Sequence, residues 1–234
     1  MRADVLRVPP VALPIAPASA VRHAAYVRIT HWMHTAGFIG LVVSGTAILL
    51  AHPRLYWGET GAWDVPPLIN LPLPLVLGHS GWGRYLHFLS AWVCVLAGLV
   101  YVIAGVASRH LQRELIPRRS DVALARLGQV AAEHLRRRFV VDDAREYNVI
   151  QRLAYVSVVL VLFPLAIASG LAMSPAIASV APLLVNTFGG QQSARTIHFF
   201  AAAALVLFLI VHVTMVVRAG FVRRMRAMIV GTVD

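Results

Sequence analysis

Five histidines lie within long apolar stretches of the sequence, and the spacing of four of them suggests that their imidazole side chains could hold a metal. His198 and His212 share one stretch and are fourteen residues apart, while His31 and His87 each lie near the start of another. In an α-helix, fourteen residues rise about 21 Å and fall about 40° short of four full turns. Both side chains then face one side of the helix, one near each end. Because an imidazole inside a membrane is costly without a partner, this spacing predicts two ligand sites at two levels of a helical bundle.

The elements that must position these histidines are four stretches long enough to cross a bilayer. About 30 Å of hydrocarbon takes about 20 apolar helical residues, and four segments meet that requirement: Ile29–Ala51, Tyr85–Ser108, Leu153–Met173 and Thr196–Val217. Hydrophobic residues make up 59% of the chain, and the mean hydropathy is +0.72, both above what a soluble domain needs. The sequence predicts an all-α fold, an integral membrane bundle of four transmembrane helices.

The distribution of basic residues predicts how the bundle is oriented. All 21 basic residues are arginines, and eighteen of them precede the first span, follow the fourth, or lie in the segment 109–152. The opposite side has only Arg54, Arg84 and Arg195. The positive-inside rule then places both termini and residues 109–152 in the cytoplasm. This explains the net charge of +11 without nucleic-acid binding.

Three parts follow along the chain. Residues 1–25 form a proline-rich cytoplasmic tail, residues 26–218 the four-helix domain, and residues 219–234 a basic cytoplasmic tail. Ala18-Ser19-Ala20 resembles a signal-peptidase site, but prolines interrupt the preceding apolar run, so we expect this segment to be retained. The single cysteine, Cys94, lies inside a span. A c-type haem attachment motif is therefore absent from the sequence, and any haem must be held non-covalently.

The span directions predict which histidines share a level. His87 and His198 are each the third residue of a span that starts on the outer side, so they form an outer pair. His31 is the third residue of the first span, which starts on the inner side, and His212 lies near the inner end of the fourth span. They therefore form an inner pair. His34, one turn from His31, is an alternative inner ligand. Haem iron with two histidine ligands has no open position, which indicates electron transfer rather than oxygen chemistry.

An arginine lies three residues before three of these four histidines. The pairs are Arg28 with His31, Arg84 with His87, and Arg195 with His198. Residues i and i+3 share one helix face, and a guanidinium one turn nearer the water can pair with a haem propionate. The alternative is that these arginines lie at helix ends and only extend their charged groups to the water interface, without binding a haem.

These motifs resemble the di-haem cytochrome b subunits of nickel-iron hydrogenases and formate dehydrogenases. The resemblance covers about residues 26–218 and rests on the following segments: Arg28-Ile-Thr-His31-Trp32, Gly83-Arg84-Tyr85-Leu86-His87, Tyr147-Asn148-x-x-Gln151, and the His198 and His212 pair. It implies a bacterial inner-membrane subunit with two b haems, the outer held by His87 and His198 and the inner by His31 and His212.

Two further segments resemble one branch of that family. They are His52-Pro53-Arg54-Leu55-Tyr56-Trp57-Gly58-Glu59 after the first span and Phe188-Gly189-Gly190-Gln191-Gln192-Ser193-Ala194-Arg195 before the fourth. Members of this branch occur alongside periplasmic molybdopterin oxidoreductases. The resemblance therefore implies an electron-transfer subunit that connects the membrane quinone pool with such a partner.

The resemblance also implies a quinone site beside the inner haem, near the start of the third span. By position it assigns Asn148 to the quinone, with Gln151 nearby. The chain departs from some relatives at Val149 and Ile150, where those have a glycine or another small residue. Asn148 is also suited to cap the third helix at its N-terminus, and the two roles are compatible.

The loop between the first two spans separates two hypotheses about the partner. A stand-alone haem b quinone reductase that oxidises a small periplasmic reductant such as superoxide needs a basic, open entrance. Residues 52–84 are instead rich in proline and aromatic residues, which favours a docking surface through Tyr56, Trp57 and Trp63, or an interfacial aromatic belt. A proton-relaying transporter is disfavoured, because no span contains Asp or Glu.

Overall fold

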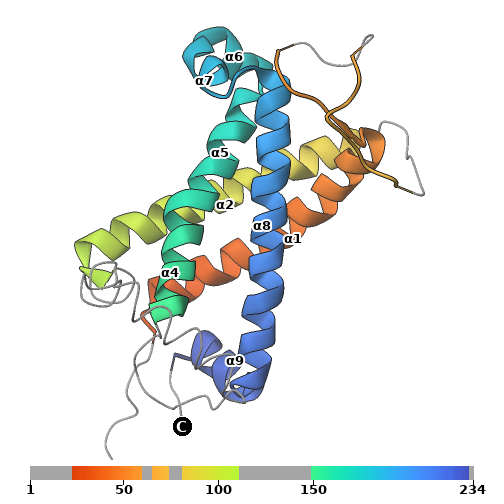
Figure 1. Ribbon diagram of the computed structural model, residues 1–234. Coiled ribbons are helices and arrows are strands. Elements are labelled where there is room, and N and C mark those ends of the chain that lie inside the picture. Colours follow the sequence, from red (N-terminus) through yellow and green to blue (C-terminus); the bar gives the residue numbers. More distant parts are fainter. Residues whose placement is uncertain (1–22, 60–64, 74–80, 111–148, 232–234) are drawn as a thin grey trace, which may run out of the picture.

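The computed structural model describes residues 23–59, 65–73, 81–110 and 149–231, and Figure 1 shows them as an elongated bundle of helices. Four helical segments are long and apolar enough to cross a membrane. They are α1 (Ala25–Ala51), α2 (Gly81–Ala107), a third span over Leu153–Ala172, and α8 (Gln191–Arg218). The predicted all-α fold with four membrane spans is confirmed.

All four helical segments begin about one turn before the predicted spans. The hydropathy pattern marks only the residues that must lie in hydrocarbon, whereas the backbone hydrogen bonds continue into the polar interface. As a result Arg28, Arg84 and Arg195 all lie inside helices, in α1, α2 and α8 respectively. The predicted spans were therefore too short at these ends.

The third span is interrupted by a wider helical turn. It runs through α4 (Val149–Ser157), the π-helical turn η3 (Val158–Leu162) and α5 (Phe163–Ala172). Pro164 lies two residues after the end of this turn, in the first turn of α5. Because proline has no N–H to donate and its ring clashes with the carbonyl of the preceding turn, a π-helical turn accommodates it without ending the helix.

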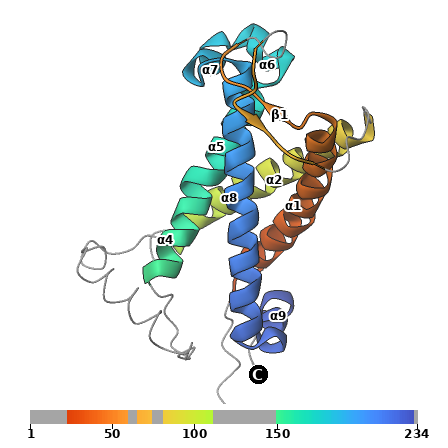
Figure 2. The ribbon, with the colours of Figure 1, turned by 45° about the vertical axis from the view of Figure 1, so that its right-hand side comes forward.

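The four spans pack as two pairs, α1 with α2 and α5 with α8. Figures 1 and 2 show the two pairs crossing each other. Glycines allow α1 and α2 to approach closely: a Cβ atom at Gly37 would lie 2.7 Å from Cys94 Sγ, and one at Gly40 would collide with Ser90 Oγ. Such small-residue contacts are typical of membrane helices, where lipid offers no hydrophobic drive for association.

The burial pattern is the reverse of that in a soluble bundle. The buried residues in the spans are mostly small or polar, among them Ser44, Ser90 and Ser169, while large apolar side chains such as Leu96 and Leu207 are exposed. Exposed leucines at mid-span would be unfavourable in water but contact hydrocarbon in a bilayer. The side-chain arrangement therefore agrees with a membrane environment.

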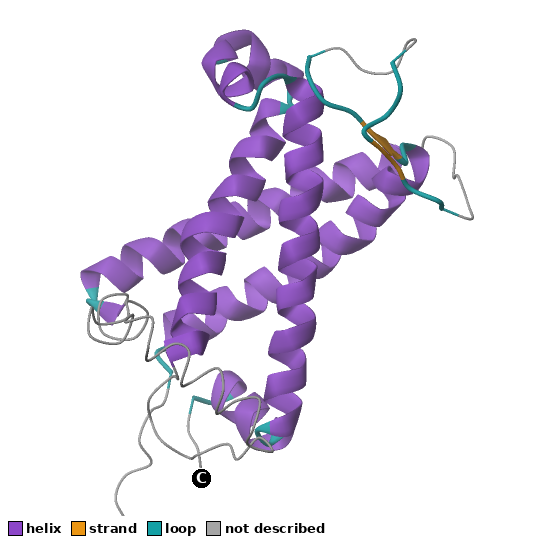
Figure 3. Cartoon of the chain, in the orientation of Figure 1, coloured by secondary structure: helices purple, strands orange, loops and turns teal. Residues whose placement is uncertain are grey.

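Short elements cover the two ends of the bundle (Figure 3). At one end lie α6 (Pro175–Val180), α7 (Pro182–Thr187), and the antiparallel strands β1 (Arg54–Leu55) and β2 (Ile69–Asn70). At the other end α9 (Phe221–Ile229) follows α8 after Gly220. The sequence predicts loops and a tail for these segments, because such short helices have too few residues to show a reliable period.

The segment after α1 is fastened to the start of α8. Thr196 Oγ1 donates to the Tyr56 carbonyl at 2.6 Å, and Gly58 N–H donates to Ser193 Oγ at 2.8 Å. Tyr56 is only 7% exposed, whereas Trp57 is 59% exposed. The expectation that Tyr56 forms a docking surface is therefore wrong, because its ring is buried. Trp63 lies outside the described residues.

Candidate functional site

Two pairs of histidines connect the two helix pairs. His31 of α1 faces His212 of α8 with ring centroids 6.5 Å apart, and His87 of α2 faces His198 of α8 at 6.1 Å. One pair lies toward the α9 end of α8 and the other toward the α6 and α7 end. The structure thus brings together the residues that were predicted as inner and outer pairs.

The separation of the rings fits a haem iron between each pair. A ligating imidazole nitrogen lies about 2 Å from its metal and about 1 Å from its own ring centroid. Two imidazoles on opposite sides of one iron therefore have centroids about 6 Å apart. The two measured separations, 6.1 and 6.5 Å, match this value.

Hydrogen bonds at His87 leave its Nε2 atom available as a ligand. Ser44 Oγ donates its proton to the Gly40 carbonyl at 2.6 Å and lies 3.0 Å from His87 Nδ1. Since that proton is already used, Ser44 accepts a hydrogen bond from His87 Nδ1–H. The neutral imidazole then has its free lone pair on Nε2, the arrangement usual for metal-binding histidine.

His198 is held in the same tautomer by a backbone group. Its Nδ1 lies 2.9 Å from the Ala166 carbonyl and 3.2 Å from Ser169 Oγ. A carbonyl can only accept, so Nδ1 carries the proton and Nε2 the lone pair. A Cβ atom at Gly170 would lie 3.3 Å from His198 Cε1, so glycine provides the space that this ring occupies.

The pair near α9 is surrounded by aromatic rings. His31 packs edge-on against Trp32 at 5.4 Å, and His212 stacks on Phe208 at 5.8 Å and meets Tyr155 at 6.3 Å. His31 Nδ1 is buried and has no hydrogen-bond partner among the described residues. This level is therefore more apolar than the level of His87 and His198.

His34 has a different environment from His31. Its Nδ1 lies 2.8 Å from the Thr30 carbonyl of its own helix, and its ring meets Phe163 at 5.7 Å. Among the described residues it is the His31 ring, not that of His34, that lies in ring contact with His212. This arrangement supports His31 as the inner ligand.

Comparison with known proteins identifies the family. Residues 22–231 match the family model described as prokaryotic cytochrome b561. The chain belongs to this family. It is also 29% identical over 197 residues to a candidate protein-methionine-sulfoxide reductase subunit, YedZ1 of Azospira oryzae, an alignment that covers 83% of this chain and 89% of the relative. No solved structure matches the chain significantly.

Membership of this family, together with the four apolar spans, establishes the general function of the protein. The cytochrome is a multi-pass protein of the bacterial inner membrane that binds haem b and transfers electrons. Among the described residues, the facing histidine pairs could hold this group, since haem b has no covalent attachment and depends on axial ligands.

Two of the three predicted propionate arginines contact other segments of the cytochrome. Arg28 Nη1 donates to the Ile229 carbonyl of α9 at 2.7 Å, and Arg195 Nη2 donates to the His52 carbonyl at 2.5 Å. Arg84 is exposed near the start of α2. The first two arginines therefore connect the ends of the bundle, a role that the spacing to histidine did not indicate. Their pairing with propionates remains a prediction.

The predicted quinone residues are not placed by the structure. Asn148 lies outside the described residues, and for Gln151 only its place in α4 is described. By contrast, sequence reasoning missed Ser44 and Ser169, the hydroxyl partners of the outer histidines. A serine inside an otherwise apolar span was the available signal, because a polar side chain there needs a partner.

Replacing Ser44 with alanine tests the hydrogen bond to His87. Without its acceptor, His87 becomes a weaker electron donor to the iron, so the midpoint potential of one haem component should rise by on the order of tens of millivolts. Thr46→Ala is the matched control, because Thr46 Oγ1 donates to the Val42 carbonyl of its own helix and to no other group among the described residues. Optical redox titration measures both variants, and equal shifts in the two would contradict this role for Ser44.

Proposed function

We propose that the chain is a di-haem electron-transfer subunit that connects the membrane quinone pool with a periplasmic oxidoreductase. The observation that carries this proposal is the presence of two histidine pairs, His31 with His212 and His87 with His198, toward opposite ends of α8. The two histidines of α8 are fourteen residues apart, or about 21 Å along the axis. That distance supports one redox site near each membrane surface.

Each histidine pair has the ring separation that a bis-histidine haem needs. When bound, haem b supplies one-electron oxidation and reduction at its iron. With both imidazoles of a pair bound, the iron would have no position left for an external ligand. The hydroxyls of Ser44 and Ser169 orient the outer rings, and the apolar spans exclude water.

The orientation follows from the arginines. We place α6, α7 and the β1–β2 pair in the periplasm, because only three arginines lie on that side of the spans. Both termini lie in the cytoplasm, and α9 belongs to the segment 219–234. His87 and His198 then hold the outer haem, and His31 and His212 the inner one.

Histidine variants test the two-haem arrangement directly. The purified chain should contain two low-spin b haems, and replacing His87 or His198 with alanine should remove the outer haem alone. Replacing His31 or His212 should remove the inner haem, while His34→Ala serves as the control and keeps both. Pyridine haemochrome assay with protein quantitation gives the ratio, and a single haem in the fully loaded wild type would refute the pairing.

The quinone site belongs to the cytoplasmic half of the bundle. We assign it to Asn148, with Gln151 nearby, because these residues directly precede or begin the third span. Tyr155, further along this span, contacts the ring of His212 at 6.3 Å. The start of the third span is thus near the inner histidine pair, which supports electron exchange between that haem and a quinone.

An alanine at position 148 separates quinone binding from helix capping. If Asn148 donates to a quinone carbonyl, losing that bond costs about 1 kcal/mol and should slow haem oxidation by quinone about fivefold with both haem spectra intact. Stopped-flow oxidation of the reduced protein measures this rate. Unchanged kinetics with a lower melting temperature would leave only the capping role.

The partner is expected at the α6 and α7 end. The relative from Azospira oryzae is named as a subunit of a protein-methionine-sulfoxide reductase, which supports an oxidoreductase partner for this chain too. We propose a periplasmic molybdopterin oxidoreductase. The exposed rings of Trp57 and Trp82 lie at the same end as the outer pair, as a docking surface over the outer haem requires.

Tryptophan variants test this docking surface. Replacing Trp57 and Trp63 with alanine should release the partner from the purified complex, because interface tryptophans commonly contribute 2 kcal/mol or more, roughly a thirtyfold loss in affinity. Trp92→Ala is the control, since Trp92 is equally exposed, at 62%, but lies within the membrane span of α2. A wild-type protein that isolates alone and reduces quinone with electrons from superoxide would establish the stand-alone function instead.

A further inference from the structure

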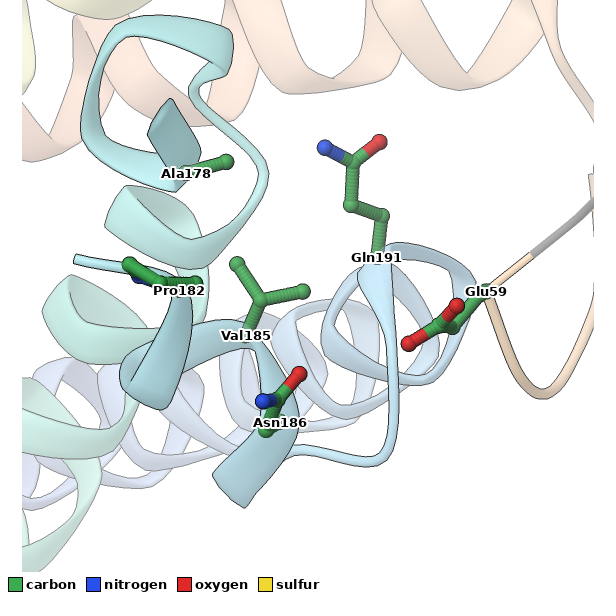
Figure 4. A pocket seen from close by; sticks show the side chains of 6 residues that line it. All are labelled: Glu59, Ala178, Pro182, Val185, Asn186 and Gln191. Carbon is green, nitrogen blue, oxygen red and sulfur yellow. The ribbon is translucent and has the colours of Figure 1, made fainter. Parts of the chain in front are cut away.

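A cavity opens at the periplasmic end of the bundle, outside the histidine sites. It has a volume of about 230 Å³ and is lined by three separate segments of the chain: Glu59, Ala178, Pro182, Val185, Asn186 and Gln191. Figure 4 shows the Glu59 carboxylate reaching toward Val185 and Asn186, while the Gln191 amide is directed to another side of the cavity. The cavity therefore combines an apolar wall with a carboxylate and two amides.

Glu59 is unusual in this chain. Ten acidic residues stand against 21 arginines, and Glu59 is the only acidic residue in the part that the structure describes. Its carboxylate makes no hydrogen bond or ion pair with the described residues. An acceptor-only group with a full negative charge at the edge of a concave site favours a cationic ligand.

The walls of the cavity are fixed by main-chain contacts. The Gly58 carbonyl accepts hydrogen bonds from the backbone N–H groups of Gln192 at 3.0 Å and Ser193 at 3.3 Å. Gly190 has φ +108° and approaches so closely that a Cβ atom would collide with the Gly58 carbonyl. The backbone beside Glu59 and Gln191 is thus held in one position, which favours a preformed site over one that forms on binding.

The size of the cavity limits the kind of ligand. Sites for drug-sized molecules usually measure about 300–1,000 Å³, which exceeds this volume of about 230 Å³. Among the described residues no group of three or more metal-ligating side chains exists, so a metal ion is also disfavoured. One long side chain of another protein fits the volume, with its methylene groups against Val185 and Pro182.

We propose that this cavity receives an arginine side chain of the periplasmic partner, with its guanidinium on the Glu59 carboxylate. Arginine is favoured over lysine because its planar fork can donate to a carboxylate through two parallel bonds, and because arginine is enriched in protein interfaces. The inference rests on the proposed function, since it requires a partner at this end.

The position of the cavity suits electron transfer. Gln191 precedes His198 by seven residues of α8, which is about 10 Å along the helix axis. A partner anchored at Glu59 would therefore sit directly above the outer histidine pair. The site would set the orientation of the partner, whereas the exposed Trp57 provides apolar contact area.

Glu59→Gln in the full-length complex tests the proposal, since it removes the charge and keeps the shape. The partner is first dissociated from the wild-type complex and then bound to each variant in nanodiscs, with surface plasmon resonance as the readout. We expect the dissociation rate to rise about tenfold and the association rate to change less than about twofold, as for a close charge pair. Arg54→Gln, which alters an exposed charge on β1, is the control and should leave the dissociation rate unchanged.

Labelling of Glu59 gives a second readout. Carbodiimide with glycine ethyl ester should modify Glu59 in the isolated chain and not in the complex, as measured by mass spectrometry. An unchanged dissociation rate in Glu59→Gln, or equal labelling in both states, would overturn the arginine site, while loss of the partner in the tryptophan variants would still support the proposed function. A wild-type chain that binds no partner would overturn both.

Discussion

The facing imidazole rings between the two helix pairs set the spacing on which the other features of the bundle depend. The α1–α2 pair and the α5–α8 pair pack internally, and the histidine rings meet across the space between them. Ring centroids about 6 Å apart leave room for an intervening metal. The separation of the two helix pairs therefore decides whether two histidines can share one metal ion.

Close packing within each pair makes that separation possible. Gly37 and Gly40 bring α1 against Ser90 and Cys94 of α2, and Gly170 of α5 makes room for the ring of His198. Small residues thus let α1 approach α2 closely and leave space for a histidine ring between α5 and α8. The buried hydroxyls of Ser44 and Ser169 lie beside the histidine rings, where each can accept a hydrogen bond from a histidine Nδ1–H.

Hydropathy and spacing were sufficient to predict the spans and the pairing of the histidines across them, because both depend on simple helical periodicity. They were not sufficient for the ends of the bundle. The contact of Arg28 with Ile229 joins residues 201 positions apart, and no local pattern encodes such a partner. Tyr56 was expected at the surface as an aromatic loop residue, but Thr196 and the start of α8 bury it. Local sequence also gave no sign of the cavity at Glu59, because Glu59 forms it together with residues of α6, α7 and the start of α8, more than 100 positions away in the chain.

The contribution of α8 to both histidine pairs has a consequence for biosynthesis. Because His198 and His212 lie in the last of the four spans, a nascent chain that has inserted only the first three carries His31 and His87 without their facing rings. Translation proceeds at about 5–20 residues per second, so both half-sites persist for seconds before α8 emerges. The two sites are then completed in a single late step, and a truncated chain without α8 has neither. Premature termination before α8 thus yields a product with neither facing histidine pair.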